Sequence, residues 1–459
     1  MGKQVPFLRD NIIHCPNGSQ VQCRGSDVNK VHGHRNSNCI FIESTVLGIS
    51  LDIAHFACVY FCAKQRDMAP NLLGKSSSFL MAEATSAEPV QIIATKESLQ
   101  QSYQTYQQQI KQSVPRKAPK YKWEIVWRNV LAFVLLHGVG TYGIYCMLLG
   151  RVKIFTIAFN ILFAVFAGLG VTAGAHRLWA HRTYKAKFPL RLLLAFFHTA
   201  ALQNDIHEWV RDHRVHHKFT DTDADPHNAS RGFFFSHIGW LMLRKHKDVL
   251  EKGKTVDMSD VEADPVVMFQ KKYYVFLVTM LTFLIPAHIP WYCWKENYLL
   301  AWYMCIFRYA LSLNVTWLVN SAAHIWGTKP YDNTIGPTEN KYVSALGFGE
   351  GWHNYHHTFP WDYKAAELGD YKLNYTTAVL DFMSRIGQAY DLKTASMEMV
   401  KKRVARTGDG SWTNGKVEGE SNKDHHHHTH EECVWGWGDK DMDEEEIRDV
   451  REFNNLKED

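Results

Sequence analysis

Four long runs with almost no charged residues limit what this chain can fold into. Three of them contain no Asp, Glu, Lys or Arg, and the fourth contains a single arginine, Arg308. The runs are residues 129–150, 154–175, 273–294 and 298–323. A helix that crosses a bilayer needs about 20 predominantly apolar residues. We therefore predict an all-α integral membrane protein with four transmembrane helices.

The links between these runs predict two helical hairpins. Only residues 151–153 separate the first pair of runs, and only residues 295–297 separate the second pair. All other segments then lie on the opposite face of the membrane and form a helical cap, which includes a shorter apolar helix at 192–204. Lys and Arg are denser beside the spans on the cap side than in the two links. The positive-inside rule therefore puts the cap and both termini in the cytoplasm.

A buried arginine needs a partner in this scheme. Arg308 inside the fourth run would cost roughly 2.5–3.5 kcal/mol on insertion. We expect its side chain to face protein or water.

The segments outside the runs have different compositions. Residues 121–407 are expected to form the membrane domain. Residues 68–120 are rich in Ser, Gln and Lys and are interpreted as a mostly disordered cytoplasmic segment. Residues 1–67 are interpreted as an atypical N-terminal extension, since Met68 begins a stretch more typical of a natural protein start. Residues 408–459 are interpreted as a disordered acidic and His-rich tail, in which WGWGDKD (435–441) is a candidate docking sequence for a partner.

Charge and cysteine content exclude two classes. The net charge of +4, without a long basic run or zinc-finger spacing, gives no reason to expect nucleic-acid binding. Nine cysteines at irregular spacing do not form a disulfide framework.

Nine histidines fall in four short motifs: HRLWAH, HRVHH, NSAAH and HNYHH. They are His176, His181, His213, His216, His217, His324, His353, His356 and His357. A metal that leaves a position open for a small molecule takes at most about six ligands. Nine imidazoles therefore predict two metals side by side, at the face of the membrane.

The spacing of these histidines predicts how they are presented. HRVHH and HNYHH place three histidines at i, i+3 and i+4, which is one face of a helix. Asn320 and His324 are one helical turn apart. His176 and His181 are five residues apart, so we expect the helix to bend or end near them. Isolated histidines are interpreted as packing residues: His137, His198, His207, His237 and His288.

The ligand type narrows the chemistry. Imidazole suits Fe, Cu, Zn and Ni, and no cysteine lies near the motifs to make a closed zinc site. A carboxylate di-iron bundle needs two Glu-x-x-His pairs, but only Glu350 and His353 form one. A His-rich, redox-active dimetal site at a membrane indicates oxygen chemistry on a lipid. Candidate outer-shell carboxylates are Asp205, Glu208, Asp221, Asp223, Asp225 and Glu350.

Longer motifs carry a family resemblance. NDIHEWVRDHRVHHKF, DADPHN, GFFFSHIGW and GEGWHNYHHTFPWDY, together with HRLWAH and NSAAH, resemble the membrane acyl-CoA desaturases of the stearoyl-CoA (Delta-9) type, from about residue 126 to 410. The VWGWGDKD ending is similar to that of insect members. The resemblance implies two Fe²⁺ ions, O2 as co-substrate, a long-chain acyl-CoA, electrons from a separate cytochrome b5 and its reductase, and the endoplasmic reticulum membrane.

The resemblance also implies roles for individual residues. The nine histidines become metal ligands, and Asn320 binds one metal through water. The acyl-CoA would be held by Asn129, Asn204, Arg211, Asp212, Arg244, Lys245 and Trp317. Ala164 and Gly168 would line the end of an acyl tunnel, and their small size predicts room for long chains. Small residues at this spacing are also typical of helix packing, which is the alternative interpretation.

Three functions remain open from the sequence. The first is an acyl-CoA desaturase, with Delta-9 as the default and another position such as Delta-11 as the alternative. The second is a di-iron membrane lipid hydroxylase on the same scaffold. The third is a metal transporter or receptor, which should carry polar relay residues inside its spans, whereas these spans offer mainly Asn160 and Arg308.

Overall fold

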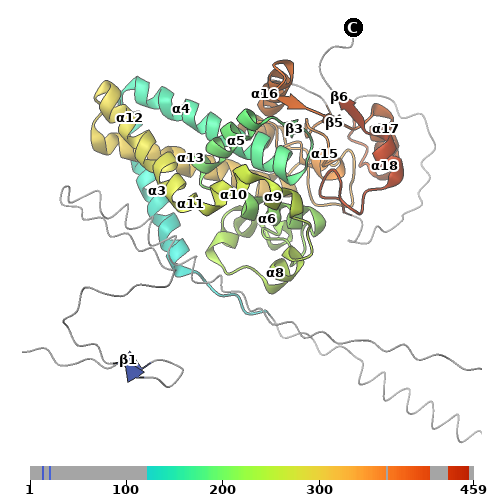
Figure 1. Ribbon diagram of the computed structural model, residues 1–459, viewed down its shortest axis with the longest axis horizontal. Coiled ribbons are helices and arrows are strands. Elements are labelled where there is room, and N and C mark those ends of the chain that lie inside the picture. Colours follow the sequence, from blue (N-terminus) through green and yellow to red (C-terminus); the bar gives the residue numbers. More distant parts are fainter. Residues whose placement is uncertain (1–12, 15–19, 22–120, 368–370, 414–432, 454–459) are drawn as a thin grey trace, which may run out of the picture. The chain divides into compact units, whose positions relative to one another are not determined.

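The computed structural model describes residues 13–14, 20–21, 121–367, 371–413 and 433–453 (Figure 1). The chain divides into two compact units, Met1–Asp52 and Ile53–Asp459. In the first unit, β1 (Ile13–His14) and β2 (Gln20–Val21) pair antiparallel. The predictions for residues 68–120 and for most of residues 1–67 lie outside the described residues.

Four helical stretches of the second unit are long and apolar enough to cross a membrane. The first is α3 (Trp127–Leu148), and the second is α4 (Ile154–Leu169) continued by η1 (Gly170–Ala180). The third runs through α11 (Tyr274–Val278), η4 (Thr279–Leu284) and α12 (Ile285–Trp294), and the fourth is α13 (Tyr298–Ile325). The predicted helical fold with four spans in two hairpins is confirmed.

Close helix contact depends on a small residue in α3. A Cβ atom on Gly143 would lie 2.8 Å from the carbonyl oxygen of Tyr303 in α13, which is too close for any side chain. The outward faces of α3 and α4 are apolar and exposed, with Leu131 of α3 at 59% and Leu162 of α4 at 52% exposure. Small residues therefore face neighbouring helices, and large apolar residues face outward where lipid would lie.

Arg308 faces protein, as the sequence requires. Its side chain is buried, Nη2 donates to the carbonyl of Thr282 at 2.8 Å, and the guanidinium lies 4.7 Å from the ring centre of Phe163. Thr282 lies in the π-helical turn η4, whose wider winding alters the regular backbone bonding of the third span.

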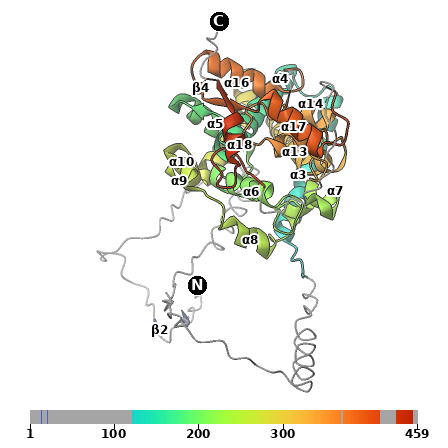
Figure 2. The ribbon, with the colours of Figure 1, turned by 90° about the vertical axis from the view of Figure 1, so that its right-hand side faces the viewer.

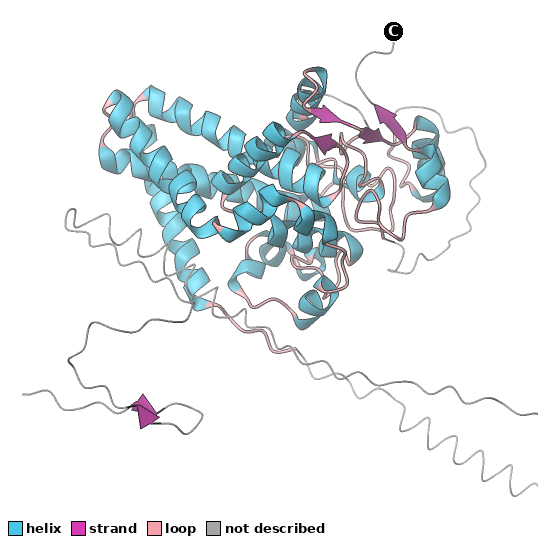
Figure 3. Ribbon diagram, in the orientation of Figure 1, coloured by secondary structure: helices cyan, strands magenta, loops and turns pink. Residues whose placement is uncertain are grey.

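The remaining elements form the cap, in which short helices predominate (Figure 3). In order they are β3 (Lys185–Ala186), α5 (Phe188–Ala201), α6 (Ile206–Lys218), η2 (Ala229–Arg231), α7 (Phe233–His237), η3 (Gly239–Met242), α8 (Lys247–Gly253), α9 (Ser259–Ala263), α10 (Pro265–Lys272), α14 (Lys341–Leu346), α15 (His353–Thr358), α16 (Tyr375–Arg385), β4 (Ala389–Tyr390), β5 (Leu392–Thr394), α17 (Met397–Thr407), α18 (Glu444–Asp449) and β6 (Arg451–Phe453). The apolar stretch predicted at 192–204 falls mostly in α5.

The core of the cap joins the second span to α6. Leu178 and Trp179 of η1, Leu194 of α5 and Val210 of α6 are buried in one cluster. Burying each such side chain contributes about 1.5–3 kcal/mol. This packing holds the two elements that carry the first five histidines against each other.

Residues 433–453 pack onto the cap. Strand β6 pairs antiparallel with β5, with Leu392 opposite Phe453 (Figure 1). Helix α18 of the same segment lies beside α17 (Figure 2). The side chain of Trp435 is buried. This differs from the expectation of a disordered tail. The acidic composition favoured disorder, but two tryptophans of this segment supply enough apolar surface for it to pack. Residues 414–432 lie outside the described residues.

Candidate metal centre

The nine motif histidines converge into two groups. The five-histidine group contains His176, His181, His213, His217 and His356. The four-histidine group contains His216, His324, His353 and His357. Within each group, one ring nitrogen from every histidine lies within 4.8 Å of the corresponding atoms of the others. The convergence that the sequence predicted is present in the structure.

A change of helix type aligns the first two ligands. The amide of His181 donates to the carbonyl of His176 at 3.1 Å, an i→i+5 bond of π-helix η1. In an α-helix, residues five apart point in different directions. The wider turn brings both rings to one side, with centroids 4.7 Å apart, and the helix ends at Ala180 as the spacing suggested.

Each of the two helices that carry three motif histidines contributes side chains to both groups. Helix α6 begins at the N-cap Asp205, whose side chain accepts from the amide of Glu208 at 3.0 Å. His213 and His217 of α6 belong to the five-histidine group, and His216 belongs to the other. Helix α15 divides its triplet in the same way, giving His356 to the first group and His353 and His357 to the second. Two helices with the same spacing therefore bridge two adjacent centres.

The spacing of the ring nitrogens fits metal coordination. Two nitrogens at right angles around a metal, each about 2.1 Å from it, lie about 3.0 Å apart. The Nε2 atoms of His181 and His213 are 2.8 Å apart, and those of His176 and His356 are 2.9 Å apart. In the four-histidine group, Nε2 of His353 lies 3.2 Å from Nε2 of His324 and 3.2 Å from Nε2 of His357. Both groups have the donor type and spacing of a metal site.

Burial keeps the ligands unprotonated. It lowers the pKa values of His213 and His217 well below the usual range, and neighbouring imidazoles lower them further. The pKa values of His181, His353, His356 and His357 fall for the same reasons. A neutral imidazole presents the lone pair that a metal requires.

The Nδ1 atoms of three histidines contact carboxylates, which identifies the residues that orient these rings. Nδ1 of His176 lies 2.8 Å from Glu350, and Nδ1 of His216 lies 2.9 Å from Asp225. Nδ1 of His324 lies 3.4 Å from Asp221. Such contacts fix the tautomer that turns Nε2 toward the metal.

Three of the six candidate carboxylates therefore support ligands. Asp205 instead caps α6, and Glu208 forms an ion pair with Lys245. Asp223 is exposed.

The supporting carboxylates stay ionised. Burial alone would raise the pKa of Glu350, but Arg177, at 2.9 Å, and His176 outweigh burial and hold the pKa below its usual range. Burial of Asp225 is likewise outweighed by His216 and His227, so its pKa is also lowered. Negative charge thus lies behind ligands of both groups.

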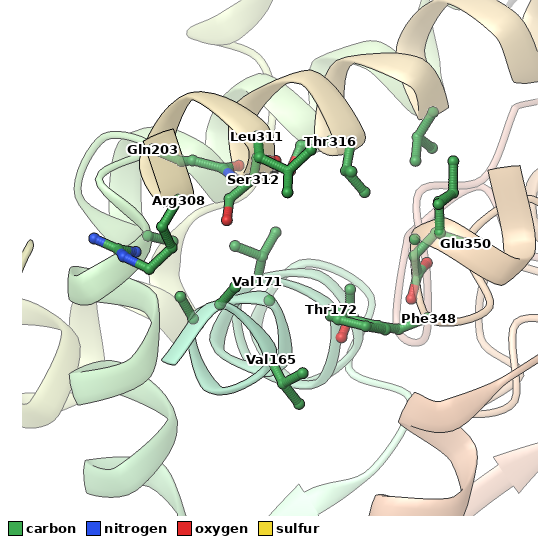
Figure 4. Close-up of a pocket in the computed structure, with 18 of the residues that line it drawn as sticks. Val165, Val171, Thr172, Gln203, Arg308, Leu311, Ser312, Thr316, Phe348 and Glu350 are labelled. Atoms are coloured by element: carbon green, nitrogen blue, oxygen red, sulfur yellow. Dashed lines mark hydrogen bonds between the residues drawn. The ribbon is translucent and has the colours of Figure 1, made fainter. Parts of the chain in front are cut away.

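A mainly apolar cavity of about 540 Å³ reaches the metal centre (Figure 4). His176 and His213 of the five-histidine group and His216 and His353 of the four-histidine group all line it, together with Asn320. In Figure 4, Leu311, Ser312 and Thr316 of α13 face Val171 and Thr172 of η1 across the opening. The cavity then follows α4 and α13 into the spans.

Ala164 and Gly168 both line this cavity. A Cβ atom on Gly168 would lie 2.2 Å from Cε2 of Phe348, a residue with φ of +58°. Phe348 therefore occupies the space beside Gly168. This contact could not be predicted from the sequence, because 180 positions separate the two residues.

The residues matched to acyl-CoA binding fall in two places. Arg211 contacts Asp212 at 3.2 Å, and Lys245 contacts Asp212 at 2.5 Å, so these three form one ionic cluster. Trp317 is buried against Phe133 of α3.

The three other matched residues are Asn129, Arg244 and Asn204. Asn129 donates to the carbonyl of Leu241 at 2.7 Å, and Arg244 forms an exposed pair with Glu124. Asn204 follows α5 in a left-handed conformation, with φ of +69°. The basic side chains are already paired with carboxylates, so an anionic ligand would have to compete with them.

Comparisons with known proteins agree with this geometry. The family model described as "Fatty acid desaturase" matches residues 152–369. An acyl-CoA Delta-9 desaturase of Acheta domesticus is 60% identical over 292 residues, which are 63% of this chain and 81% of that protein. An acyl-CoA Delta12-desaturase of the same species is 57% identical, covering 65% of this chain and 84% of that protein. Stearoyl-CoA desaturase 4 of Mus musculus is 52% identical, covering 64% and 83%. With the two histidine groups and four spans in place, this chain belongs to the fatty acid desaturase family.

Proposed function

We propose that this protein is an acyl-CoA desaturase that introduces a cis double bond, at the Delta-9 position by default, into a saturated long-chain acyl-CoA. The observation that carries this proposal is one apolar cavity lined by histidines of both groups. An extended hydrocarbon chain in that cavity would lie against both groups at once. The Delta-9 relative at 60% identity supports the default position, and the Delta-12 relative at 57% keeps the alternative position in view.

The nine histidines would hold two Fe²⁺ ions, with Asn320 contributing through a water molecule. When bound, the irons would supply, with O2, two electrons and two protons, the oxidising power that removes two hydrogens from adjacent methylenes and yields two waters. Neutral imidazoles suit this metal, and the supporting carboxylates Glu350, Asp225 and Asp221 orient them.

The polypeptide's own contribution is to bind and orient the chain. Each CH₂ removed from water contributes about 0.8 kcal/mol, so a long acyl chain gains most of its affinity in the cavity. Arg211, Arg244 and Lys245 would meet phosphates of the CoA group, because guanidinium and ammonium groups pair strongly with phosphate. Asn129, Asn204, Asp212 and Trp317 would complete the substrate site, and Ala164 and Gly168 would shape the far part of the tunnel.

We further propose that the protein lies in the endoplasmic reticulum membrane with the cap and both termini in the cytoplasm. Lys122 just before the first span, Arg128 at its start, and Arg182 and Lys185 after the second support this orientation. Cytochrome b5 and its reductase would then deliver electrons on that side. Protease protection of tags placed at the C-terminus and in the 295–297 link would test the orientation: only the former should be cleaved in sealed vesicles.

Expression in a host that lacks its own desaturase and needs unsaturated fatty acid tests the function. We expect growth without supplement and a cis double bond at carbon 9 when the products are mapped. The variant His213→Ala serves as the inactive control. A hydroxylated product would instead favour the lipid hydroxylase, and a bond at carbon 11 or 12 would correct the position alone.

A further inference from the structure

The C-terminal segment, residues 433–453, touches a metal ligand directly. Nδ1 of His181 donates to the carbonyl oxygen of Trp435. In return, the amide of Trp437 donates to the carbonyl of His181 at 2.9 Å. Both His181 and Trp435 are buried. A segment more than 250 positions away in the sequence thus contacts His181 through both its ring and its backbone.

A glycine makes this approach possible. Gly436 has φ of +157°, and a Cβ atom there would lie 2.6 Å from the carbonyl oxygen of His181 and 2.7 Å from its Cα. Real Cβ atoms do not come so close to backbone, so any other residue would push the segment away from His181. Gly438 also has a positive φ, of +80°, but its Cβ would meet only the end of the Arg182 side chain at 3.1 Å.

The Trp435 ring secures the end of π-helix η1. It lies 4.0 Å from the guanidinium carbon of Arg214 and 5.0 Å from that of Arg182. Arg214 donates to the carbonyls of Trp179 at 2.7 Å and Ala180 at 3.0 Å, the last two residues of η1. The segment therefore braces the helix end from which His181 projects.

Ion pairs hold the segment in place. Lys218, at the end of α6, contacts Asp439 at 2.6 Å and also Asp441. Asp439 in addition accepts from the amide of Trp435 at 2.9 Å, whereas Lys218 is the one side chain within the described part of the chain that bonds to the carboxylate of Asp441. Asp439 thus links the helix of His213 and His217 to the tryptophan that contacts His181.

We propose that the C-terminal segment is a positioning element of the five-histidine group, acting through the carbonyl of Trp435. Accepting the Nδ1–H of His181 fixes the tautomer in which Nε2 carries its lone pair toward the metal. The segment lies outside residues 152–369, the part that matches the desaturase family model. This inference rests on the proposed function, since it assumes that the two groups hold iron.

Two matched pairs of full-length variants test it, each compared with wild type. Gly436→Ala presses on the backbone of His181, while Gly438→Ala introduces a methyl group at a positive φ without that contact. Asp439→Asn weakens the anchor of Trp435, while Asp441→Asn removes only the second carboxylate near Lys218. The readouts are iron per protein after purification, the rate of iron loss to a ferrous chelator, and the thermal midpoint.

We expect Gly436→Ala to lose iron about tenfold faster than wild type, which is the usual range for an outer-shell contact. The rate of iron loss from Asp439→Asn should lie between the rates for wild type and Gly436→Ala. Gly438→Ala and Asp441→Asn should stay within about twofold of wild type. Should Gly436→Ala fail to fold, the aspartate pair decides. Wild-type iron retention in both Gly436→Ala and Asp439→Asn, or equal losses within each pair, would overturn the proposal. Wild-type protein without iron would instead contradict the proposed function.

Discussion

The two histidine groups present the same kind of side chain but are held by different supporting residues. The five-histidine group is backed by one carboxylate, Glu350, and by the carbonyl of Trp435. The four-histidine group is backed by two carboxylates, Asp225 and Asp221. One group therefore depends on a buried ion pair and on the C-terminal segment, and the other on a loop after α6. A metal ion bound by each group should therefore be lost for a different structural reason.

Removing a ligand should have the largest effect. We expect His213→Ala and His357→Ala each to retain about one iron instead of two and to lose at least about 100-fold in activity, because the affected group no longer completes its coordination. Iron analysis and turnover of the purified variants check this. His198→Leu is the control: His198 is fully buried, but neither ring nitrogen has a hydrogen-bond partner among the described residues. Loss of both irons from each variant would mean that the groups are not independent.

Neutralising a supporting carboxylate should have a different effect in each of the two groups. Glu350→Gln leaves Arg177 buried without its carboxylate, a change that typically costs 3–5 kcal/mol. We expect a lower thermal midpoint and weaker iron binding together. Asp225→Asn, beside His216 and His227, should lower iron affinity about 10–100-fold with a smaller loss of stability. Equal losses of stability in Glu350→Gln and Asp225→Asn would show that the two groups do not differ in how they depend on their carboxylates.

Filling the cavity should change the product and leave the metals in place. Ala164→Leu narrows the space that both groups share, so we expect a shift toward shorter acyl chains with two irons retained. Gas chromatography of the products measures the shift. Leu162→Phe, on the exposed face of α4, is the control. An unchanged chain-length profile would favour the helix-packing interpretation of the small residues. Gly168 is a poorer position for this test, because a side chain there must first displace Phe348.

The isolated histidine His198 should make the stability of the protein depend on pH. Burial lowers the pKa of His198 to about 3. Between the unfolded value of about 6.5 and that pKa, the unfolded chain binds a proton that the folded chain excludes, so stability falls as pH falls. We expect wild type to lose up to about 2 kcal/mol more than His198→Leu between pH 7 and pH 5. Parallel stability curves for the two proteins would show that His198 gains its proton in the folded state.

The sequence predicted the spans and the convergence of nine histidines because both follow from local composition and spacing. The sequence could not assign each histidine to one of the two groups. An i, i+3, i+4 triplet predicts that three side chains share one helix face, but not which group each of them joins. The five-residue gap between His176 and His181 indicated an irregular helix, and the structure explains it as a π-helix.

Contacts between distant segments were beyond prediction. Phe348 beside Gly168, and Trp435 beside His181, depend on how remote parts of the chain pack. The tryptophans of WGWGDKD were the one available signal for the second contact, and the acidic surroundings argued against folding.

Each of the two histidine groups is proposed to hold one iron. Anomalous diffraction at the iron edge from crystals of active protein would locate both ions. Two separate peaks are predicted, one among His176, His181, His213, His217 and His356 and the other among His216, His324, His353 and His357. A single peak, or iron bound elsewhere in an active protein, would contradict the account.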